Sequence, residues 1–410
     1  MTCVTTPPDV LVVGAGLAAT RTVAALREHG YDGHVRVLGA EGLAPYDRPP
    51  LSKHLLDRTG PAWLADEIDA DLGALADDVR LAEPARTLRP APVGTTVVTD
   101  VAEHTAACVV LATGSAAARP AGWDARTLHT AQDAAGLRDL LGAGTRRLVL
   151  VGAGWIGAEV AGVAAAAGHD VTVVEAADAP LAGPLGVEVG ALTRPWYAAA
   201  GVRLLTGVRV AAVRPDAVTL ADGRTLAADV VLVAVGARPA TAWLGDALPR
   251  DEGRLRVDEA YRVLGPDGPV PGLHAVGDVA VRRSARYGWV PGGHWDAALR
   301  GPDVLVRHLL GVPADPATGD DLVPYAFSTQ LGHDLALLGL PSPGDVPTVL
   351  RAPDDAGFSV LWSRPDGTTT AALAADRPRD VGAARRLLAP AALPRIDPGD
   401  ATSLAALRRR

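Results

Sequence analysis

Two glycine-rich stretches in the sequence have the spacing that binds the phosphates of a dinucleotide. The first, residues 9–19, carries Gly14, Gly16 and Ala19 directly after a run of four apolar residues. Glycines at the first two positions permit a tight turn and a close approach of the backbone to a pyrophosphate, and a small third residue lets a helix pack on the strand. Residues 20–29 suit a helix whose N-terminal amides would face that pyrophosphate. The stretch therefore predicts a strand–turn–helix unit that binds a dinucleotide.

The same pattern recurs in the middle of the chain, where Gly152, Gly154 and Gly157 follow the predicted strand 147–151. A helix is predicted to follow over residues 156–168. One such fingerprint indicates little, because glycine turns are also common in α/β proteins that bind no nucleotide. Two of them, each with its own strand, helix and acid, indicate two nucleotide-binding units.

Each unit also delivers an acid that is suited to a ribose. The predicted strand 34–38 leads to Glu41, and the predicted strand 170–174 leads to Glu175. A carboxylate binds the ribose diol of NADH but repels the phosphate that NADPH carries there. Residues 176–182 contain no Arg or Lys that could receive such a phosphate. The second unit is therefore predicted to bind NADH.

Residues 45–53 contain Arg48 and Lys53 among three prolines. Because proline fixes its own backbone and lacks an N–H, the segment is predicted to be a rigid, extended loop rather than a helix. Arg48 could reach a cofactor phosphate, and Lys53 could place a positive charge near a ring that becomes electron-rich on reduction. The alternative is a surface loop with solvated charges, and the residues alone do not choose between the two.

Three other side chains are candidates for the site. Glu159, in the first turns of the second predicted helix, either approaches a nicotinamide or favours the helix N-terminus. Asp278, at the end of an apolar strand, either binds a cofactor or serves as a turn residue. Trp295 either packs against a flavin or fills a seam between domains.

The segment 282–289 is locally basic in an acidic protein, with Arg282, Arg283 and Arg286 close together. A run of charges is usually a solvated face. This run is close in sequence to a predicted cofactor strand, so docking of an acidic partner is the second interpretation.

Composition excludes several classes of protein. With 410 residues and a net charge of −8 at pH 7, the chain should hold two or three domains and is not expected to bind nucleic acid. No apolar run approaches the roughly 20 residues needed to span a bilayer, and the N-terminus lacks the pattern of a secretion signal, so we expect a cytoplasmic protein. The two cysteines, Cys3 and Cys108, form no Cys-x-x-Cys. They exclude a redox dithiol and a protein-bound iron–sulfur cluster, and no metal site is predicted.

A set of motifs resembles the ferredoxin reductase family, the single-component FAD reductases that serve bacterial cytochromes P450 and Rieske oxygenases and share their fold with apoptosis-inducing factor. The resemblance covers residues 9–395. Its motifs are Pro45-Tyr46-Asp47-Arg48-Pro49-Pro50-Leu51-Ser52-Lys53, which is the most diagnostic, the two glycine units, Ala112-Thr113-Gly114, Gly277-Asp278 and His294-Trp295.

The resemblance implies a role for each matching residue. The residues expected to bind FAD are Gly14, Gly16, Ala19, Glu41, Arg48, Lys53, Thr113, Gly114, Asp278 and Trp295. Those expected to bind NADH are Gly152, Gly154, Gly157, Glu159, Glu175 and Gly236. Lys53, Glu159 and Trp295 are expected where hydride passes to the flavin. Electrons would then leave one at a time to a ferredoxin-type iron–sulfur protein docked near Arg282, Arg283 and Arg286, and the protein is expected to be a monomer or weak homodimer.

The expected fold is α/β, with two Rossmann-like dinucleotide-binding domains, for FAD and NAD, and a C-terminal α+β domain. We expect the FAD domain over residues 1–117 and 242–320, the NAD domain over 118–241 and the C-terminal domain over 321–410. The strands 108–115 and 229–236 match in form, and each closes one nucleotide unit.

The sequence departs from the family pattern in two places. The usual Pro-Tyr-Phe-Trp-Ser-Asp-Gln at the start of the last domain reads Pro324-Tyr325-Ala326-Phe327-Ser328-Thr329-Gln330, and the family's Arg before the interdomain helix is replaced within residues 129–132. These departures bear on partner choice and on the stability of the reduced flavin–nucleotide complex. Two other functions therefore stay open: an NADH oxidase or reductase of quinones or small molecules, and a non-catalytic FAD/NADH redox sensor.

Overall fold

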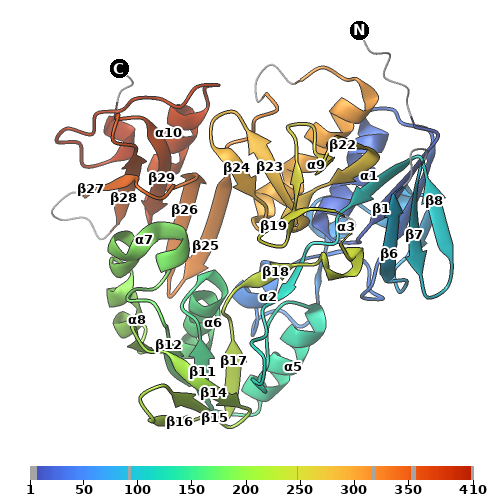
Figure 1. Ribbon diagram of the computed structural model, residues 1–410. Coiled ribbons are helices and arrows are strands. Elements are labelled where there is room, and N and C mark those ends of the chain that lie inside the picture. The colour runs from blue at the N-terminus through green and yellow to red at the C-terminus, as the bar shows by residue number, and fades with distance from the viewer. Residues whose placement is uncertain (1–6, 91–93, 247, 315–318, 352–356, 408–410) are drawn as a thin grey trace. The chain divides into compact units, whose positions relative to one another are not determined.

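The computed structural model describes residues 7–90, 94–246, 248–314, 319–351 and 357–407 (Figure 1). The chain forms two compact units. The first consists of Met1–Asp47, Ala62–Ala116 and Arg238–Tyr325, and the second of Arg48–Pro61, Ala117–Ala237 and Ala326–Arg410. The short strands β10 (Ser115–Ala117) and β18 (Ala237–Pro239) carry the chain from one unit to the other and back.

The first unit is built on a parallel sheet of five strands in the order β5-β2-β1-β9-β22. These strands are β1 (Asp9–Val13), β2 (His34–Leu38), β5 (Asp78–Arg80), β9 (Cys108–Leu111) and β22 (Gly268–Ala275). Consecutive apolar residues fill both faces of its central strands, and all four residues of β9 are buried. The sheet continues through β21 (Arg262–Gly265), β20 (Arg254–Val257), β23 (Ala280–Ser284) and β24 (Gly288–Pro291), and β19 (Arg250–Asp251) pairs with β20.

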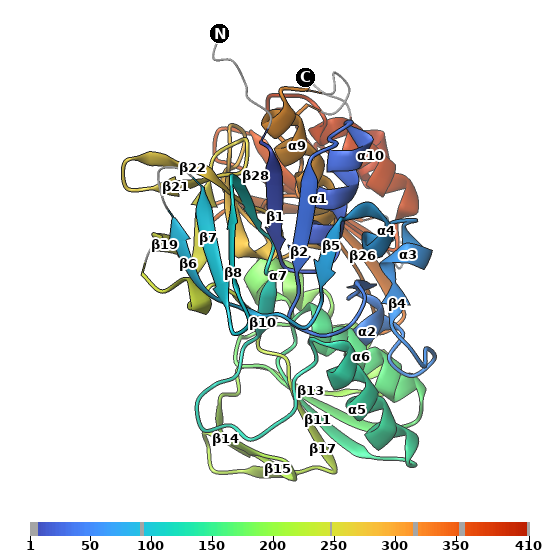
Figure 2. The ribbon, with the colours of Figure 1, turned by 90° about the vertical axis from the view of Figure 1, so that its right-hand side faces the viewer.

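Two helices of the first unit, α1 (Leu17–Glu28) and α9 (Trp295–Leu310), pack against each other. In Figure 2, α1 lies beside β1 and β2, and the small antiparallel sheet of β6 (Ala85–Pro90), β7 (Thr95–Thr99) and β8 (Glu103–Ala106) lies on the other side of β1. Short elements complete the unit: β3 (Tyr46–Asp47), β4 (Ala62–Trp63), α3 (Leu64–Glu67), α4 (Leu72–Leu75), η1 (Ala242–Leu244) and η2 (Gly277–Val279).

The second unit contains a smaller parallel sheet in the order β13-β12-β11-β17. The strands are β11 (Arg147–Val151), β12 (Asp170–Val174), β13 (Arg203–Leu205) and β17 (Val230–Val233), and the helices are α5 (Ala131–Gly142), α6 (Trp155–Ala166), α7 (Ala182–Ala191) and α8 (Arg194–Ala199). A three-stranded antiparallel sheet follows, with β14 (Val210–Arg214), β15 (Ala217–Leu220) and β16 (Thr225–Ala227). The turn between β15 and β16 contains Asp222 and Gly223.

A five-stranded antiparallel sheet ends the second unit, in the order β25-β26-β29-β28-β27. Its elements are β25 (Tyr325–Gln330), β26 (His333–Gly339), β27 (Val346–Leu350), β28 (Phe358–Ser363), β29 (Thr369–Ala375), α10 (Pro378–Leu388) and η3 (Leu404–Ala406). Leu185 and Trp196, from the region of α7 and α8, share one apolar core with Leu335, Phe358 and Leu373 of this sheet. The C-terminal sheet is therefore part of the core of this unit.

The α/β fold with two parallel sheets and a C-terminal antiparallel sheet is confirmed, whereas the individual domain bounds stay predictions. One local prediction is wrong. Residues 45–53 do not form an extended loop throughout, because Pro50–Lys53 is the short helix α2. Pro50 occupies its first turn, where a missing N–H costs no hydrogen bond and the fixed backbone angle suits a helix.

Within the described ranges, none of the helices is long and apolar enough to cross a bilayer. The prediction about the extreme N-terminus, including Cys3, falls outside those ranges.

Candidate active site

The first glycine loop combines one tightly packed glycine with one open one. Gly14 has φ +120°, and a Cβ there would lie 2.1 Å from the carbonyl oxygen of Ala112, at the end of β9. Gly16 is the N-cap of α1, and a Cβ there would meet nothing within 4 Å. Ala19 is fully buried. The loop is thus closely packed on the sheet side and open at the helix N-terminus, which fits a pyrophosphate.

The second glycine loop repeats this arrangement in the second unit. Gly152 has φ +108°, and a Cβ there would lie 2.5 Å from the carbonyl oxygen of Ala234. A Cβ on Gly157 would lie 2.1 Å from the carbonyl oxygen of Gly152, whereas one on Gly154, the N-cap of α6, would meet nothing within 4 Å. Both loops therefore have the shape that a dinucleotide phosphate requires.

The acids predicted for the two riboses do not occupy equivalent positions. Glu175 directly follows β12, and its carboxylate accepts hydrogen bonds from the backbone N–H of Ala153 (2.7 Å) and Ala177 (2.8 Å). In the first unit the residue directly after β2 is Gly39, where a Cβ would lie 2.8 Å from that of Ala15. The strand end is therefore too crowded for an acid there.

Glu41 lies two residues further along, at the surface, and its Oε2 accepts a hydrogen bond from the Tyr46 hydroxyl at 2.5 Å. This partner was not predicted, although Tyr46 belongs to the motif at residues 45–53. Whether Glu41 also binds a ribose stays a prediction.

Three predicted FAD residues meet at the carboxyl edge of the first parallel sheet. Asp278 follows β22 in η2, and its Oδ2 accepts a hydrogen bond from the Ser115 hydroxyl at 2.7 Å. Thr113 follows β9 and donates to the carbonyl of Ala240 at 2.9 Å. Gly14 follows β1, which lies next to β9 in the sheet. This edge is where open α/β sheets bind their ligands. Ser115 is a further candidate that the sequence analysis did not name.

Trp295 is the first residue of α9, and its indole is fixed by the motif at residues 45–53. The indole Nε1 donates to Asp47 Oδ1 at 2.7 Å. The side chain is half-buried. Its neighbour His294 is the N-cap of α9, and burial lowers the pKa of that imidazole. The indole therefore has a set orientation within the first unit.

Lys53 and Glu159 form a buried ion pair in the second unit. Lys53 Nζ lies 3.3 Å from Glu159 Oε1, and the two side chains are 15% and 6% exposed. The Ser52 hydroxyl donates to Glu159 Oε2 at 2.5 Å. Both ends of this pair are predicted site residues, but their contact could not be predicted, because 106 residues separate them in the chain (159 − 53).

Arg48 also lies in the second unit, where its Nη1 donates to the carbonyl of His129 at 2.5 Å. The segment that departs from the family pattern begins α5. Thr130 caps this helix by accepting from the Asp133 N–H at 3.1 Å, and the Asp133 carboxylate accepts from the Thr130 N–H. A capping box thus occupies the place of the family's Arg.

The predicted docking patch of three arginines is wrong for two of them. Arg282 and Arg286 are buried and pair with Asp321, at 3.2 and 3.3 Å. Only Arg283 keeps an exposed side chain, 2.8 Å from Glu259. Arg283 is the exposed residue of β23, whose other residues are buried, and the carboxylate that neutralises Arg282 and Arg286 comes from a segment more than 30 residues further along the chain.

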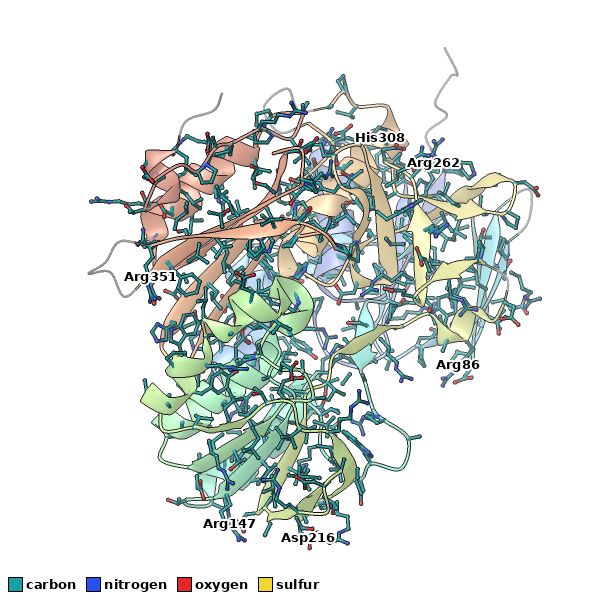
Figure 3. All side chains as sticks on the ribbon, turned by 60° about the vertical axis from the view of Figure 1, so that its left-hand side comes forward. Arg86, Arg147, Asp216, Arg262, His308 and Arg351 are labelled. Carbon is teal, nitrogen blue, oxygen red and sulfur yellow. The ribbon has the colours of Figure 1, made fainter. Side chains whose placement is uncertain are left out.

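The same segment is held along α9. Arg307 pairs with Asp320 at 2.7 Å, and His308, which Figure 3 labels near the end of that helix, lies 2.9 Å from the same carboxylate. Asp320 and Asp321 therefore fasten the stretch that precedes β25.

We expect Asp321→Asn to lower the free energy of unfolding by about 2 kcal/mol at neutral pH, because two buried arginines lose their carboxylate. Burial alone would raise the pKa of Asp321, but the Ser284 hydroxyl and the charges of Arg282 and Arg286 outweigh it and hold that pKa below its ordinary value. A lowered pKa stabilises the fold above the unfolded value, about 3.9, and this contribution is lost as the pH falls through the folded pKa.

Chemical denaturation of wild type and Asp321→Asn at several pH values measures this effect. The difference between them should be largest near neutrality and shrink in acid. A difference that is independent of pH would contradict the assignment.

Among the described residues, Cys108 is the one free cysteine. Burial raises the pKa of this thiol to about 12, so it does not form the reactive thiolate at neutral pH. The described part of the chain also holds no group of His, Cys, Asp or Glu side chains that could bind a metal ion.

Comparison with known proteins identifies the family of the chain. The family model for pyridine nucleotide-disulphide oxidoreductases matches residues 8–299, and the model for the reductase C-terminal domain matches residues 325–405. The ferredoxin–NAD(+) reductase component of the anthranilate 1,2-dioxygenase system of Burkholderia cepacia is 34% identical over 405 residues, which is 94% of this chain and 95% of the relative.

Solved structures agree as well. The crystal structure of Fdr9 superposes with a TM-score of 0.86 at 38% identity, over 97% of this chain and 98% of Fdr9. The reductase of the covalent putidaredoxin reductase–putidaredoxin complex superposes with a TM-score of 0.80 at 25% identity, over 95% of this chain and 94% of that one. These matches confirm the predictions of an oxidoreductase that uses FAD and NADH. The chain belongs to the pyridine nucleotide-disulphide oxidoreductase family, and within it to the ferredoxin reductases.

Proposed function

We propose that the protein takes hydride from NADH onto FAD and passes the electrons, one at a time, to a ferredoxin-type iron–sulfur protein that serves a cytochrome P450 or another oxygenase. The observation that carries this proposal is the pair of open glycine loops, at Gly16 and Gly154, in a chain without a redox cysteine pair. Electrons that enter such a chain have no destination of their own beyond the flavin. The Burkholderia relative, named for a ferredoxin and a dioxygenase system, supports this partner class.

The first unit supplies the residues that would hold FAD: the open turn at Gly16, and Thr113 and Asp278 at the carboxyl edge of the sheet. The bound flavin supplies the two-electron to one-electron conversion, so no side chain needs to act as an acid or base in hydride transfer.

In the second unit, Gly154 would receive the NADH pyrophosphate and Glu175 its adenosine ribose. The carboxylate of Glu175 is already fastened to the glycine loop by its bond from Ala153, so it presents a fixed negative charge beside the ribose. Lys53 would place its ammonium where the reduced ring gains negative charge. Its pairing with Glu159 keeps this ammonium in place.

Anaerobic mixing of the FAD-loaded protein with NADH tests the proposal. We expect the visible flavin absorbance to bleach, and a ferredoxin added next to pass electrons on to cytochrome c. A bound flavin that stays oxidised, or a protein that FAD cannot reconstitute, would end the proposal.

Arg283 is the member of the basic segment that remains suited to an acidic partner. Its side chain is 54% exposed and forms a surface pair with Glu259, and such a pair contributes little to stability. We expect Arg283→Glu to raise KM for ferredoxin about tenfold at low salt, and less at high salt, without a change in the rate of ferricyanide reduction. Steady-state assays with both acceptors measure this, and an unchanged KM at low salt would remove Arg283 from the docking surface.

A second candidate function follows from the difference between residues 324–330 and the family motif at the start of the last domain. Phe327 stands where the family has Trp, and its ring lies 4.4 Å from Lys53 Nζ. A ring smaller than the family's Trp leaves more room for a small oxidant, as in an NADH oxidase or a quinone reductase. Turnover with ferredoxin, quinones and oxygen under the same conditions decides between the two functions.

A further inference from the structure

The Glu159 carboxylate is contacted by three donors from two separate segments of the second unit. It is 5% exposed. Ser52 and Lys53 reach it from α2, and the Ser328 hydroxyl reaches its Oε1 from β25 of the C-terminal sheet. A buried carboxylate is stable only when its oxygens are paired or hydrogen-bonded, so each donor limits how the group can turn.

Ser328 has a defined donor direction. Its side chain is buried, and Gln330 Nε2 donates to its hydroxyl oxygen at 3.0 Å. A serine hydroxyl has one proton to give. Because Gln330 supplies a proton to the oxygen, the proton of Ser328 is directed to Glu159. The result is a chain of hydrogen bonds that runs from Gln330 through Ser328 to Glu159.

The backbone that carries Ser328 is held close to the helix that carries Glu159. A Cβ on Gly162, one turn further along α6, would lie 2.7 Å from the backbone nitrogen of Leu331. Only glycine permits this approach. The distance between Ser328 and Glu159 is therefore set by main-chain packing rather than by flexible side chains.

The same strand also contacts the other member of the ion pair. Phe327, next to Ser328, places its ring 4.4 Å from Lys53 Nζ, within the range of a cation–π contact. Consecutive residues of β25 thus contact both the acid and the ammonium.

We propose that Ser328 is a positioning residue: by orienting the Glu159 carboxylate it fixes the Lys53 ammonium, and the C-terminal sheet thereby sets how strongly the reduced flavin is stabilised. This inference rests on the proposed function, in which Lys53 acts on the flavin. Without the Ser328 proton, Glu159 Oε1 keeps only its contact with Lys53, so the carboxylate and the ammonium can shift together.

The test compares Ser328→Ala with Ser359→Ala in the FAD-loaded protein. Ser359 is a matched control, since it is also a buried serine of the C-terminal sheet that donates to a buried carboxylate, Asp380, at 2.7 Å. Stopped-flow reduction by NADH without oxygen gives the rate constant, and a redox titration gives the potential of the flavin. Both are measured on flavin-bound protein, so a partial loss of folded material does not affect them.

We expect Ser328→Ala to slow flavin reduction about tenfold, with a lower flavin potential and unchanged affinity for NADH. Ser359→Ala should match wild type in all three. In a Glu159→Gln background, Ser328→Ala should add nothing, because the two residues act as one unit. If Ser328→Ala retains no flavin, Ser328→Cys, which keeps the size and a weak donor, should give an intermediate rate.

The inference would be overturned if Ser328→Ala reduced its flavin at a rate within about twofold of wild type. It would also be overturned if Ser328→Ala slowed reduction equally in the wild-type and the Glu159→Gln backgrounds. In that case the proposed function still holds if NADH reduces the FAD bound to the wild-type protein. If NADH does not reduce that FAD, both the inference and the proposed function are overturned.

Discussion

Gly154→Asp is expected to raise KM for NADH about a hundredfold while leaving the FAD content unchanged. The space beside Gly154 is open, so the new side chain fits without disturbing the fold. Its carboxylate would lie at the N-terminus of α6, where the helix amides are predicted to meet the NADH pyrophosphate. The new carboxylate and the NADH pyrophosphate, if in direct contact, would repel each other by about a few kcal/mol in a partly buried site. Flavin bleaching at rising NADH concentrations measures the change.

The corresponding change in the first unit separates the two cofactors. Gly16→Asp should abolish FAD binding and give a colourless protein, since Gly16 is the equivalent open position at α1. Gly60→Asp is the control, because a Cβ there also meets nothing within 4 Å and no nucleotide is predicted nearby. If Gly154→Asp lost FAD and kept its affinity for NADH, the assignment of the two loops would be reversed.

Lys53→Met should lower the free energy of unfolding by about 3 kcal/mol and also slow reduction by NADH. The substitution removes the cation from a pair whose side chains are 15% and 6% exposed, so the buried Glu159 carboxylate would lose the positive charge that compensates it. The cost of an uncompensated buried charge exceeds the value of the pair itself. Thermal unfolding of the FAD-loaded protein measures the first effect, and stopped-flow reduction the second.

The double variant Lys53→Met with Glu159→Leu distinguishes these two effects. Stability should largely return, because no charge is left without a partner, whereas the reduction rate should stay low. A double variant that recovered its rate would show that the positive charge has no part in the reaction, and a fully stable Lys53→Met variant would show that the pair is not buried in solution.

The nucleotide loops were predictable because their determinants are local. Glycine spacing and an apolar strand fix the turn within a dozen residues, and Gly14 and Gly152 both meet the end of the neighbouring parallel strand as the fingerprint requires. Helix α2 was not predicted, because three prolines suggested an extended chain. Pro50 is nevertheless compatible with the first turn of a helix.

The long-range pairing partners of the charged side chains could not be predicted from the sequence. Arg282 and Arg286 were predicted to lie in a surface patch, because the residues that neighbour them in the sequence do not indicate that Asp321 pairs with them. In the same way, the Ser328 hydroxyl that reaches Glu159 comes from a strand 169 residues away. Local pattern shows which side chains are charged, but burial and pairing depend on how distant segments pack.

The shared core between α7, α8 and the last sheet has a practical consequence for engineering. Exchanging the C-terminal sheet and α10 of this reductase for those of a homologue, in order to redirect electrons to a different oxygenase, would cut through the contacts of Leu185 and Trp196 with Leu335 and Phe358. A working chimera must graft residues 181–196 together with the transplanted sheet. Otherwise the hybrid would present mismatched apolar faces and aggregate before its acceptor preference could be assayed.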